Sequence, residues 1–135
     1  MIIGIDASNI RSGGALMHLK NILKNLDVEK FNIEKIVVWS CKNTLNEIED
    51  YTWLRKCSEP VMEQEYYKRA LWQQKKLHLK LIEEKCNILF VPGGSFITKF
   101  RPVVSMSQNL IPFELRELFR YGLSFSTIKF FFLRF

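Results

Sequence analysis

Cysteine is scarce in this chain, with three residues among 135. Cys41, Cys57 and Cys86 are odd in number and show no CxxC spacing, which argues against a disulfide framework and against a cysteine zinc site. They are predicted to be reduced, half-buried thiols. This cysteine usage indicates a cytoplasmic protein.

Long apolar runs are also missing, since no segment reaches the roughly 20 apolar residues needed to span a bilayer. Low-complexity linkers and internal repeats are absent too. The hydrophobic content of 47% and the charged content of 25% are typical of a folded globular domain. At 135 residues the chain is long enough for one domain with a core and short for a two-domain enzyme.

Acidic residues are the minority charge, at 14 against 20 basic residues, so the net charge is +6. Residues 99–135 account for +4 of this net charge, because they contain six basic residues and only two acidic ones, Glu114 and Glu117. This segment also holds most of the phenylalanines, which favours a core helix or an interdomain surface. Contact with a membrane surface stays open as an alternative. Nucleic acid is not an expected partner, because the basic residues form no stripe with interleaved aromatics.

Short apolar strands alternate with amphipathic helices along the chain. Strands are predicted over 2–6, 33–39, 50–57, 88–91 and 103–106, and helices over 15–26, over 62–84 and from 114 to the end. The expected core face of the second helix consists of Tyr67, Ala70, Leu71, Leu77, Leu81 and Ile82. This alternation predicts an α/β fold with a Rossmann-like parallel sheet and helices on both faces.

Two glycine pairs follow buried strands in this prediction. Gly13-Gly14 follows the strand over 2–6 and a polar loop, and Gly93-Gly94 follows the strand over 88–91 and Pro92. Ligands of open parallel sheets bind beyond the carboxyl ends of the strands, and glycine lets a backbone approach them closely. The sequence therefore predicts two ligand-facing loops, with plain tight turns as the alternative.

A GxGxxG motif is lacking, and no acidic residue closes a clear second strand. A dinucleotide-binding oxidoreductase is expected to have both the GxGxxG motif and the acidic residue. Because both are missing here, that function is a weaker alternative. A second alternative is a non-enzymatic module that docks on a membrane or a partner through the basic segment.

Four stretches in order resemble the N-terminal half of the GT4-type glycosyltransferases. They are IDASNIRSGG (5–14), RALWQ (69–73), ILFVPGG (88–94) and VVSMSQNLIPFE (103–114). The resemblance implies a GT-B fold, in which two Rossmann-like domains face each other across a cleft. The 135 residues then correspond to the N-terminal, acceptor-side domain, and the chain is expected to stop before the donor-binding domain.

The activity implied by the resemblance is retaining transfer of a sugar from a nucleotide-sugar donor to a saccharide or lipid-linked acceptor, in cell-surface polysaccharide synthesis. Gly13 and Gly14 match the loop that meets the donor phosphates. The acceptor side would be lined by Ser95, Ser107, Gln108, Asn109 and Glu114. Many family members have a His-Asp pair where this chain has Gln108-Asn109, so hydrogen bonding is expected there rather than acid–base chemistry.

No catalytic residue is assigned, because the paired-glutamate motif of the family's donor domain is not in this sequence. The isolated chain is therefore predicted to be inactive. The resemblance implies no cofactor, the nucleotide sugar being a substrate, and no metal, in keeping with the lack of a DxD motif. The expected partners are the nucleotide sugar, the acceptor and a C-terminal domain. The expected location is cytoplasmic, with peripheral contact at the inner face of the membrane left open.

Overall fold

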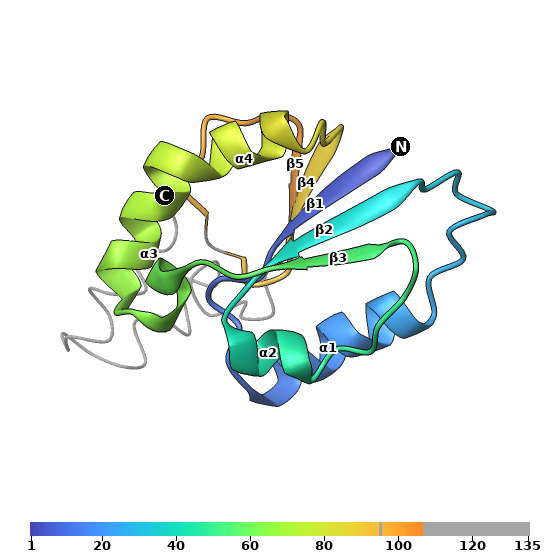
Figure 1. Cartoon of the computed structure of the whole chain (residues 1–135), viewed down its shortest axis with the longest axis horizontal. Coiled ribbons are helices and arrows are strands. Elements are labelled where there is room, and N and C mark those ends of the chain that lie inside the picture. The colour runs from blue at the N-terminus through green and yellow to red at the C-terminus, as the bar shows by residue number, and fades with distance from the viewer. Residues whose placement is uncertain (95, 107–135) are drawn as a thin grey trace, which may run out of the picture.

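A computed structural model describes residues 1–94 and 96–106 of the chain. Its centre is a sheet of five parallel strands in the order β3-β2-β1-β4-β5 (Figure 1). The strands are β1 (Ile2–Asp6), β2 (Lys35–Trp39), β3 (Leu54–Cys57), β4 (Ile88–Val91) and β5 (Val103–Ser105). The predicted α/β parallel sheet is confirmed.

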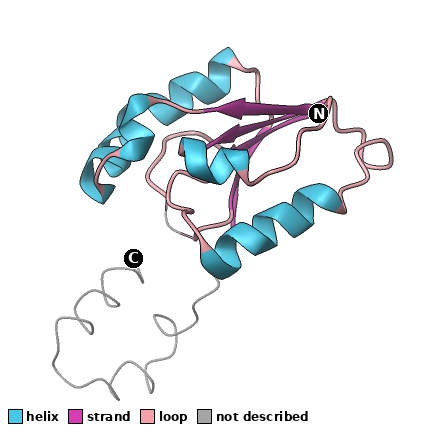
Figure 2. Ribbon diagram, turned by 60° about the horizontal axis from the view of Figure 1, so that its bottom comes forward, coloured by secondary structure: helices cyan, strands magenta, loops and turns pink. Residues whose placement is uncertain are grey.

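Helices cover both faces of this sheet (Figure 2). On one side lie α1 (Gly13–Lys24) and α2 (Lys42–Asn46). On the other lies a nearly continuous helical segment, made of α3 (Tyr66–Trp72), the π-helical turn η2 (Gln73–Leu77) and α4 (His78–Glu83). A short 3₁₀ helix, η1 (Pro60–Glu63), precedes α3. This arrangement is that of a Rossmann-like fold.

Two apolar cores result, one on each face of the sheet. Ile36 and Val38 of β2 pack toward α1, whereas Val37 and Trp39 of the same strand pack toward α4. All four side chains are buried, because successive side chains of a strand point to opposite faces and both faces are covered. This explains the continuous apolar run in the sequence.

Gly4 in β1 has a packing role on the α4 side. A Cβ at this position would collide with Leu81 and lie 3.2 Å from the Trp39 ring and 3.3 Å from the Cys86 sulfur. The missing side chain therefore lets α4 approach the central strand closely.

Most predicted element bounds hold to within a few residues. β1 and β4 have the predicted bounds, whereas β2 and β3 begin later than predicted. Helix α1 begins at Gly13, two residues early, and Ser12 occupies its N-cap position without a side-chain hydrogen bond. Helix α2 was not predicted. The helix predicted from residue 114 lies outside the described residues.

The predicted core face of the second helix is wrong in part. Leu77 and Leu81 are buried as expected, but Tyr67, Leu71 and Ile82 are 57%, 49% and 62% exposed. The π-turn η2 accounts for Tyr67 and Leu71, since its extra residue per turn shifts the inward face before the turn relative to Leu77 and Leu81 after it. As a result, Trp72 and Gln73 point inward.

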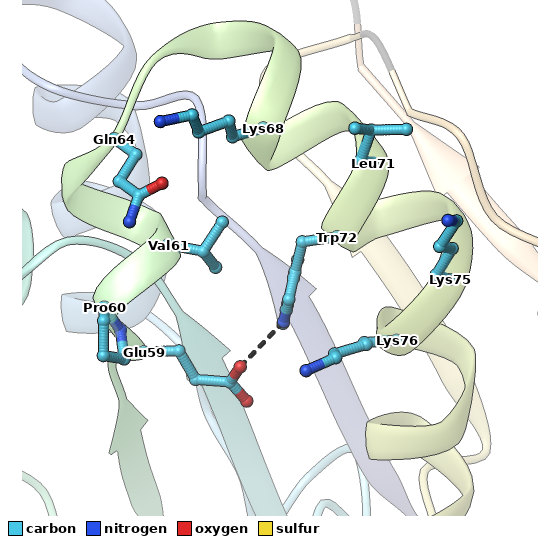
Figure 3. Close-up of a pocket in the computed structure, with 9 residues that line it drawn as sticks. All are labelled: Glu59, Pro60, Val61, Gln64, Lys68, Leu71, Trp72, Lys75 and Lys76. Carbon is cyan, nitrogen blue, oxygen red and sulfur yellow. Dashed lines mark hydrogen bonds between the residues drawn. The ribbon is translucent and has the colours of Figure 1, made fainter.

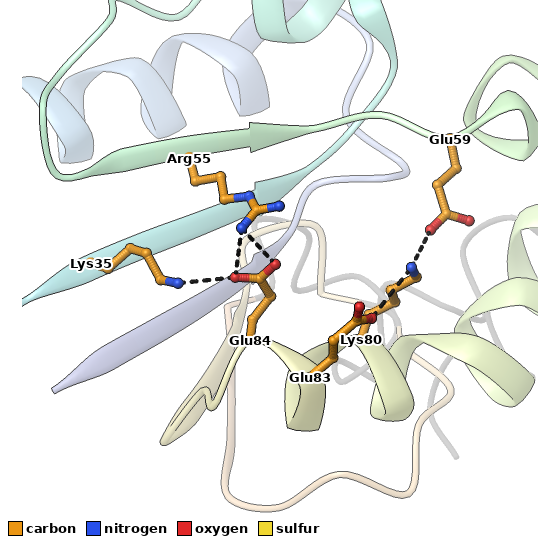
Figure 4. Close-up of polar contacts among 6 residues, drawn as sticks. All are labelled: Lys35, Arg55, Glu59, Lys80, Glu83 and Glu84. Atoms are coloured by element: carbon orange, nitrogen blue, oxygen red, sulfur yellow. Dashed lines mark hydrogen bonds and ion pairs between the residues drawn. The ribbon is translucent and has the colours of Figure 1, made fainter.

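Ion pairs join the end of α4 to the neighbouring strands (Figure 4). Glu84 accepts from Lys35 of β2 at 2.9 Å and from Arg55 of β3 at 3.0 Å. Lys80 lies 3.6 Å from Glu59, which precedes η1. These contacts hold α4 against the β3 edge of the sheet.

The three thiols are free, as predicted. The predicted half-burial is confirmed for Cys57 and is wrong for Cys41 and Cys86, which are buried in the core on the α4 face of the sheet. Within residues 1–94 and 96–106, no helix is long and apolar enough to cross a membrane.

Candidate functional site

The strand order places a topological switch point between β1 and β4. From β1 the chain crosses to β2 through α1 on one face, and it enters β4 from β3 through α3 and α4 on the opposite face. The loops after β1 and β4 therefore leave the sheet side by side and diverge. This is the position where open parallel sheets bind ligands. Both glycine pairs lie in these two loops.

The first glycine pair opens helix α1. Gly13 has a φ of +72° and is the first residue of the helix, followed by Gly14. Both glycines are exposed, and a Cβ on either would meet no heavy atom within 4 Å. No side chain caps this end, and its first turn holds no acidic residue. The backbone N–H groups of this turn are therefore accessible to an anion.

The second glycine pair follows β4. A Cβ on Gly93 would meet no atom within 4 Å, and Gly94 has a φ of +80°. Gly94 accepts a hydrogen bond from the Ser105 hydroxyl at 2.8 Å, and Met106 N–H donates to Val91 O at 3.1 Å. The loop is thus tied to the end of β5 while its tip stays open.

A buried polar cluster holds the loop between β1 and α1. Asp6 accepts hydrogen bonds from Ser8 N–H at 3.0 Å and from the Gln73 amide at 2.6 Å. The same Gln73 amide lies 3.1 Å from the Ser8 hydroxyl. All three side chains are buried, so the start of the loop is fixed by partners from β1 and η2. Asp6 therefore caps the first turn of this loop.

Two hydroxyl groups from the neighbouring β2–α2 segment hold the rest of this loop. Ser40 donates to Ala7 O at 2.8 Å, and Thr44 donates to Ile10 O at 2.7 Å. Both side chains are fully buried. Satisfied buried polar groups of this kind give a loop one defined conformation. The glycine pair is therefore presented by a rigid support.

Burial raises the pKa of the Asp6 carboxyl above its ordinary value, although hydrogen bonds from Ser8 and Gln73 act in the opposite direction. Between the unfolded and the raised folded pKa, the native state keeps a proton that the unfolded state has lost. The free energy of unfolding should therefore fall as the pH rises through that window.

Asp6→Asn is expected to remove this dependence, since an amide does not titrate there. We expect a flatter profile of unfolding free energy above about pH 4, the ordinary carboxyl pKa, measured by urea denaturation. An unchanged profile in the variant would assign the pH dependence to other groups.

Two guanidinium groups, those of Arg11 and Arg69, are anchored beside the first glycine loop. Arg11 donates to Met62 O, and Arg69 donates to Gln64 O at 2.5 Å and to Asn9 Oδ1 at 3.2 Å. Partial burial and the nearby charge of Arg11 lower the pKa of the Arg69 guanidinium. Neither guanidinium forms an ion pair with a carboxylate of the described residues. The loop therefore carries a positive potential.

Cys41 lies close to this positive charge. Its sulfur is 3.2 Å from the Thr44 hydroxyl. Burial raises the pKa of the Cys41 thiol, but hydrogen bonding with Thr44 and the charge of Arg11 outweigh it, so the pKa is lower than usual. The Cys41 side chain is buried.

The structure brings together only part of the predicted site. Gly13 and Gly14 lie at the switch point with Gly93 and Gly94. The acceptor-side residues Ser95, Ser107, Gln108, Asn109 and Glu114 lie outside the described residues. In the part of the chain described, no three His, Cys, Asp or Glu side chains gather into a metal site.

Sequence reasoning assigned no role to Arg69 and Gln73, although both belong to the RALWQ stretch that resembles the glycosyltransferases. Their contacts with Asn9 and Asp6 join positions 60 and 67 residues apart in the chain. No local pattern signals such a pairing. The resemblance of that stretch was the one available signal.

No family model, curated protein or solved structure matches this chain.

Proposed function

We propose that this chain is the acceptor-side domain of a glycosyltransferase that takes its sugar from a nucleotide-sugar donor. One observation carries the proposal: two glycine loops with open backbone lie side by side at the topological switch point between β1 and β4. The sequence resemblance to GT4-type enzymes supports it, because the same two loops belong to the stretches that carry the resemblance.

The proposed role of the first loop is to bind the donor diphosphate. The N-terminus of a helix attracts anions, because its N–H groups lack partners and the helix dipole is positive there. Arg11 adds a full positive charge from the same loop. Negative charge grows on the diphosphate as it leaves the sugar, and donors held rigidly in place lower that barrier. The buried support from Asp6, Ser8 and Gln73 supplies the rigidity.

The acceptor side of the proposal consists of Ser95, Ser107, Gln108, Asn109 and Glu114. Hydroxyl, amide and carboxylate groups suit the hydroxyl-rich surface of a saccharide. We propose a saccharide or lipid-linked acceptor of cell-surface polysaccharide synthesis, transfer with retention of configuration, and a donor-binding domain as the other half of the cleft. Peripheral contact with a membrane belongs to the same proposal.

A dinucleotide-dependent oxidoreductase is the second candidate, favoured only by the strand order. Its cofactor needs a carboxylate after β2 for the ribose hydroxyls. At that position the chain has Ser40 and Cys41, and the Ser40 hydroxyl is already used on Ala7 O. The glycosyltransferase proposal is therefore preferred.

The test is an assay of the protein as its gene encodes it, with UDP-, GDP- and ADP-sugars and with saccharide and lipid-linked acceptors. We expect acceptor-stimulated release of the nucleoside diphosphate, and a product whose anomeric configuration, read by NMR, equals that of the donor. Release from no donor, together with binding of a nicotinamide cofactor, would establish the second candidate instead. An inverted product would contradict retention.

A further inference from the structure

A groove of about 420 Å³ lies between η1 and the helical segment of α3 and η2 (Figure 3). We call it the lysine groove and define it by Pro60, Val61, Lys68, Leu71, Trp72 and Lys76. Its volume falls in the range of pockets that hold small molecules. All its lining residues come from residues 59–76, and none belongs to the two glycine loops. The groove therefore shares no residue with the two glycine loops.

Three lysine side chains line the groove, and no carboxylate pairs with their ammonium groups in the part of the chain described. Lys68, Lys75 and Lys76 are exposed, and none forms an ion pair with a carboxylate of residues 1–94 or 96–106. The one carboxylate in the lining, Glu59, accepts from the Trp72 indole N–H at 2.8 Å and lies 3.6 Å from Lys80. The groove thus offers uncompensated positive charge.

The helix places two of these lysines on either side of one aromatic ring. Lys68 and Lys76 are four residues before and four residues after Trp72. The π-turn η2 has more residues per turn than an α-helix, so it keeps Lys76 on the same face as Lys68. Figure 3 shows Lys68 at the Gln64 end of the groove and Lys76 at the Glu59 end, with Val61 and Trp72 between them.

The walls between these ammonium groups are apolar. Leu71 is 49% exposed, Val61 is half-buried, and the Trp72 ring closes the inner side. An apolar surface next to uncompensated cations is complementary to a molecule that carries an anionic head on an apolar body. Removing such surface from water is favourable.

We propose that the lysine groove binds a phosphate ester with an apolar body. A phosphate monoester has three terminal oxygens and close to two negative charges at neutral pH, so its charge matches that of the Lys68 and Lys76 ammonium groups together. Its apolar body lies against Val61, Leu71 and Trp72. The inference is independent of the proposed transferase activity, since it uses none of its residues.

The test uses the full 135-residue chain and octyl phosphate below its micellar concentration. Binding is measured by calorimetry, and the Trp72 indole N–H resonance is followed by NMR. We expect saturable binding that shifts this resonance. Lys68→Gln with Lys76→Gln should weaken binding at least about tenfold. The matched control, Lys24→Gln with Lys99→Gln, removes the same charge from exposed positions elsewhere and should leave binding unchanged.

Inorganic phosphate and lipid vesicles are the two comparison ligands of this test. Inorganic phosphate should bind at least about tenfold more weakly than octyl phosphate, because it lacks the apolar body. Equal affinity of the two anions would overturn the proposal, as would equal weakening by both lysine pairs. Vesicles of phosphatidylcholine with phosphatidic acid separate a lipid headgroup from a soluble ester. Binding to these vesicles without any binding of octyl phosphate would mean surface attraction, and would also overturn it.

Discussion

Gly14→Val is expected to reduce sugar transfer by about 100-fold or more while the fold stays intact. A Cβ at Gly14 would meet no heavy atom within 4 Å, and its φ lies outside the left-handed region, so the side chain enters open space. In the proposed mechanism this space is where the donor phosphates approach the N–H groups of α1. The branched side chain would hold them away. Gly13 is a less clean target, because its φ of +72° would strain any other residue.

The matched control is Met17→Val, which introduces the same branched residue about one turn further along α1. Met17 is 55% exposed and does not belong to the glycine loop. We expect this variant to transfer sugar at the wild-type rate. Urea denaturation should show both variants within about 1 kcal/mol of the wild type. Wild-type transfer by Gly14→Val would remove this loop from the mechanism.

Gln73→Leu is expected to lower the free energy of unfolding by about 2 to 4 kcal/mol. Gln73 is 2% exposed and donates to the Asp6 carboxyl and to the Ser8 hydroxyl. Leucine has a similar size but no donor. In the variant, the Asp6 carboxyl and the Ser8 hydroxyl stay buried but lose this hydrogen-bond donor. The unfolded state can hydrate both groups, so the loss lowers the free energy of unfolding.

Gln74→Leu is the control for this experiment. Gln74 is the next residue of the same π-turn, and its side chain is exposed. The two variants share the chemical change and the helical context, and they differ in burial and in hydrogen bonding. We expect Gln74→Leu to change the free energy of unfolding by less than about 0.5 kcal/mol. Equal effects of the two variants would show that the buried cluster does not stabilise the fold.

The strands were predictable because their signal is local. β1 and β4 are short, largely apolar runs, and such runs are typical of strands buried on both faces. The placement of both glycine pairs at one edge also followed from the sequence. Parallel strands present their carboxyl ends on the same side, so loops after β1 and β4 had to meet there.

The helical segment before β4 was predicted less well. Regular helical spacing predicted that Tyr67, Leu71 and Ile82 are buried in the core. In the structure these side chains are exposed, and Trp72 and Gln73, at the start of the π-turn η2, are buried. Helix propensity and regular periodicity do not signal a π-turn. In the structure, Gln73 of this turn donates to Asp6 across the fold.

By itself, the sequence determined the α/β class, the buried strands and the edge on which the two glycine loops lie, since these depend on local patterns and on the geometry of parallel strands. Only the tertiary structure decided which polar groups support the loop after β1, and which face of the helix carries the lysine groove. The reason is that burial and pairing depend on residues far apart in the chain. Asp6 meets Gln73, and Glu59 meets Trp72, only after the sheet and both helical layers have formed.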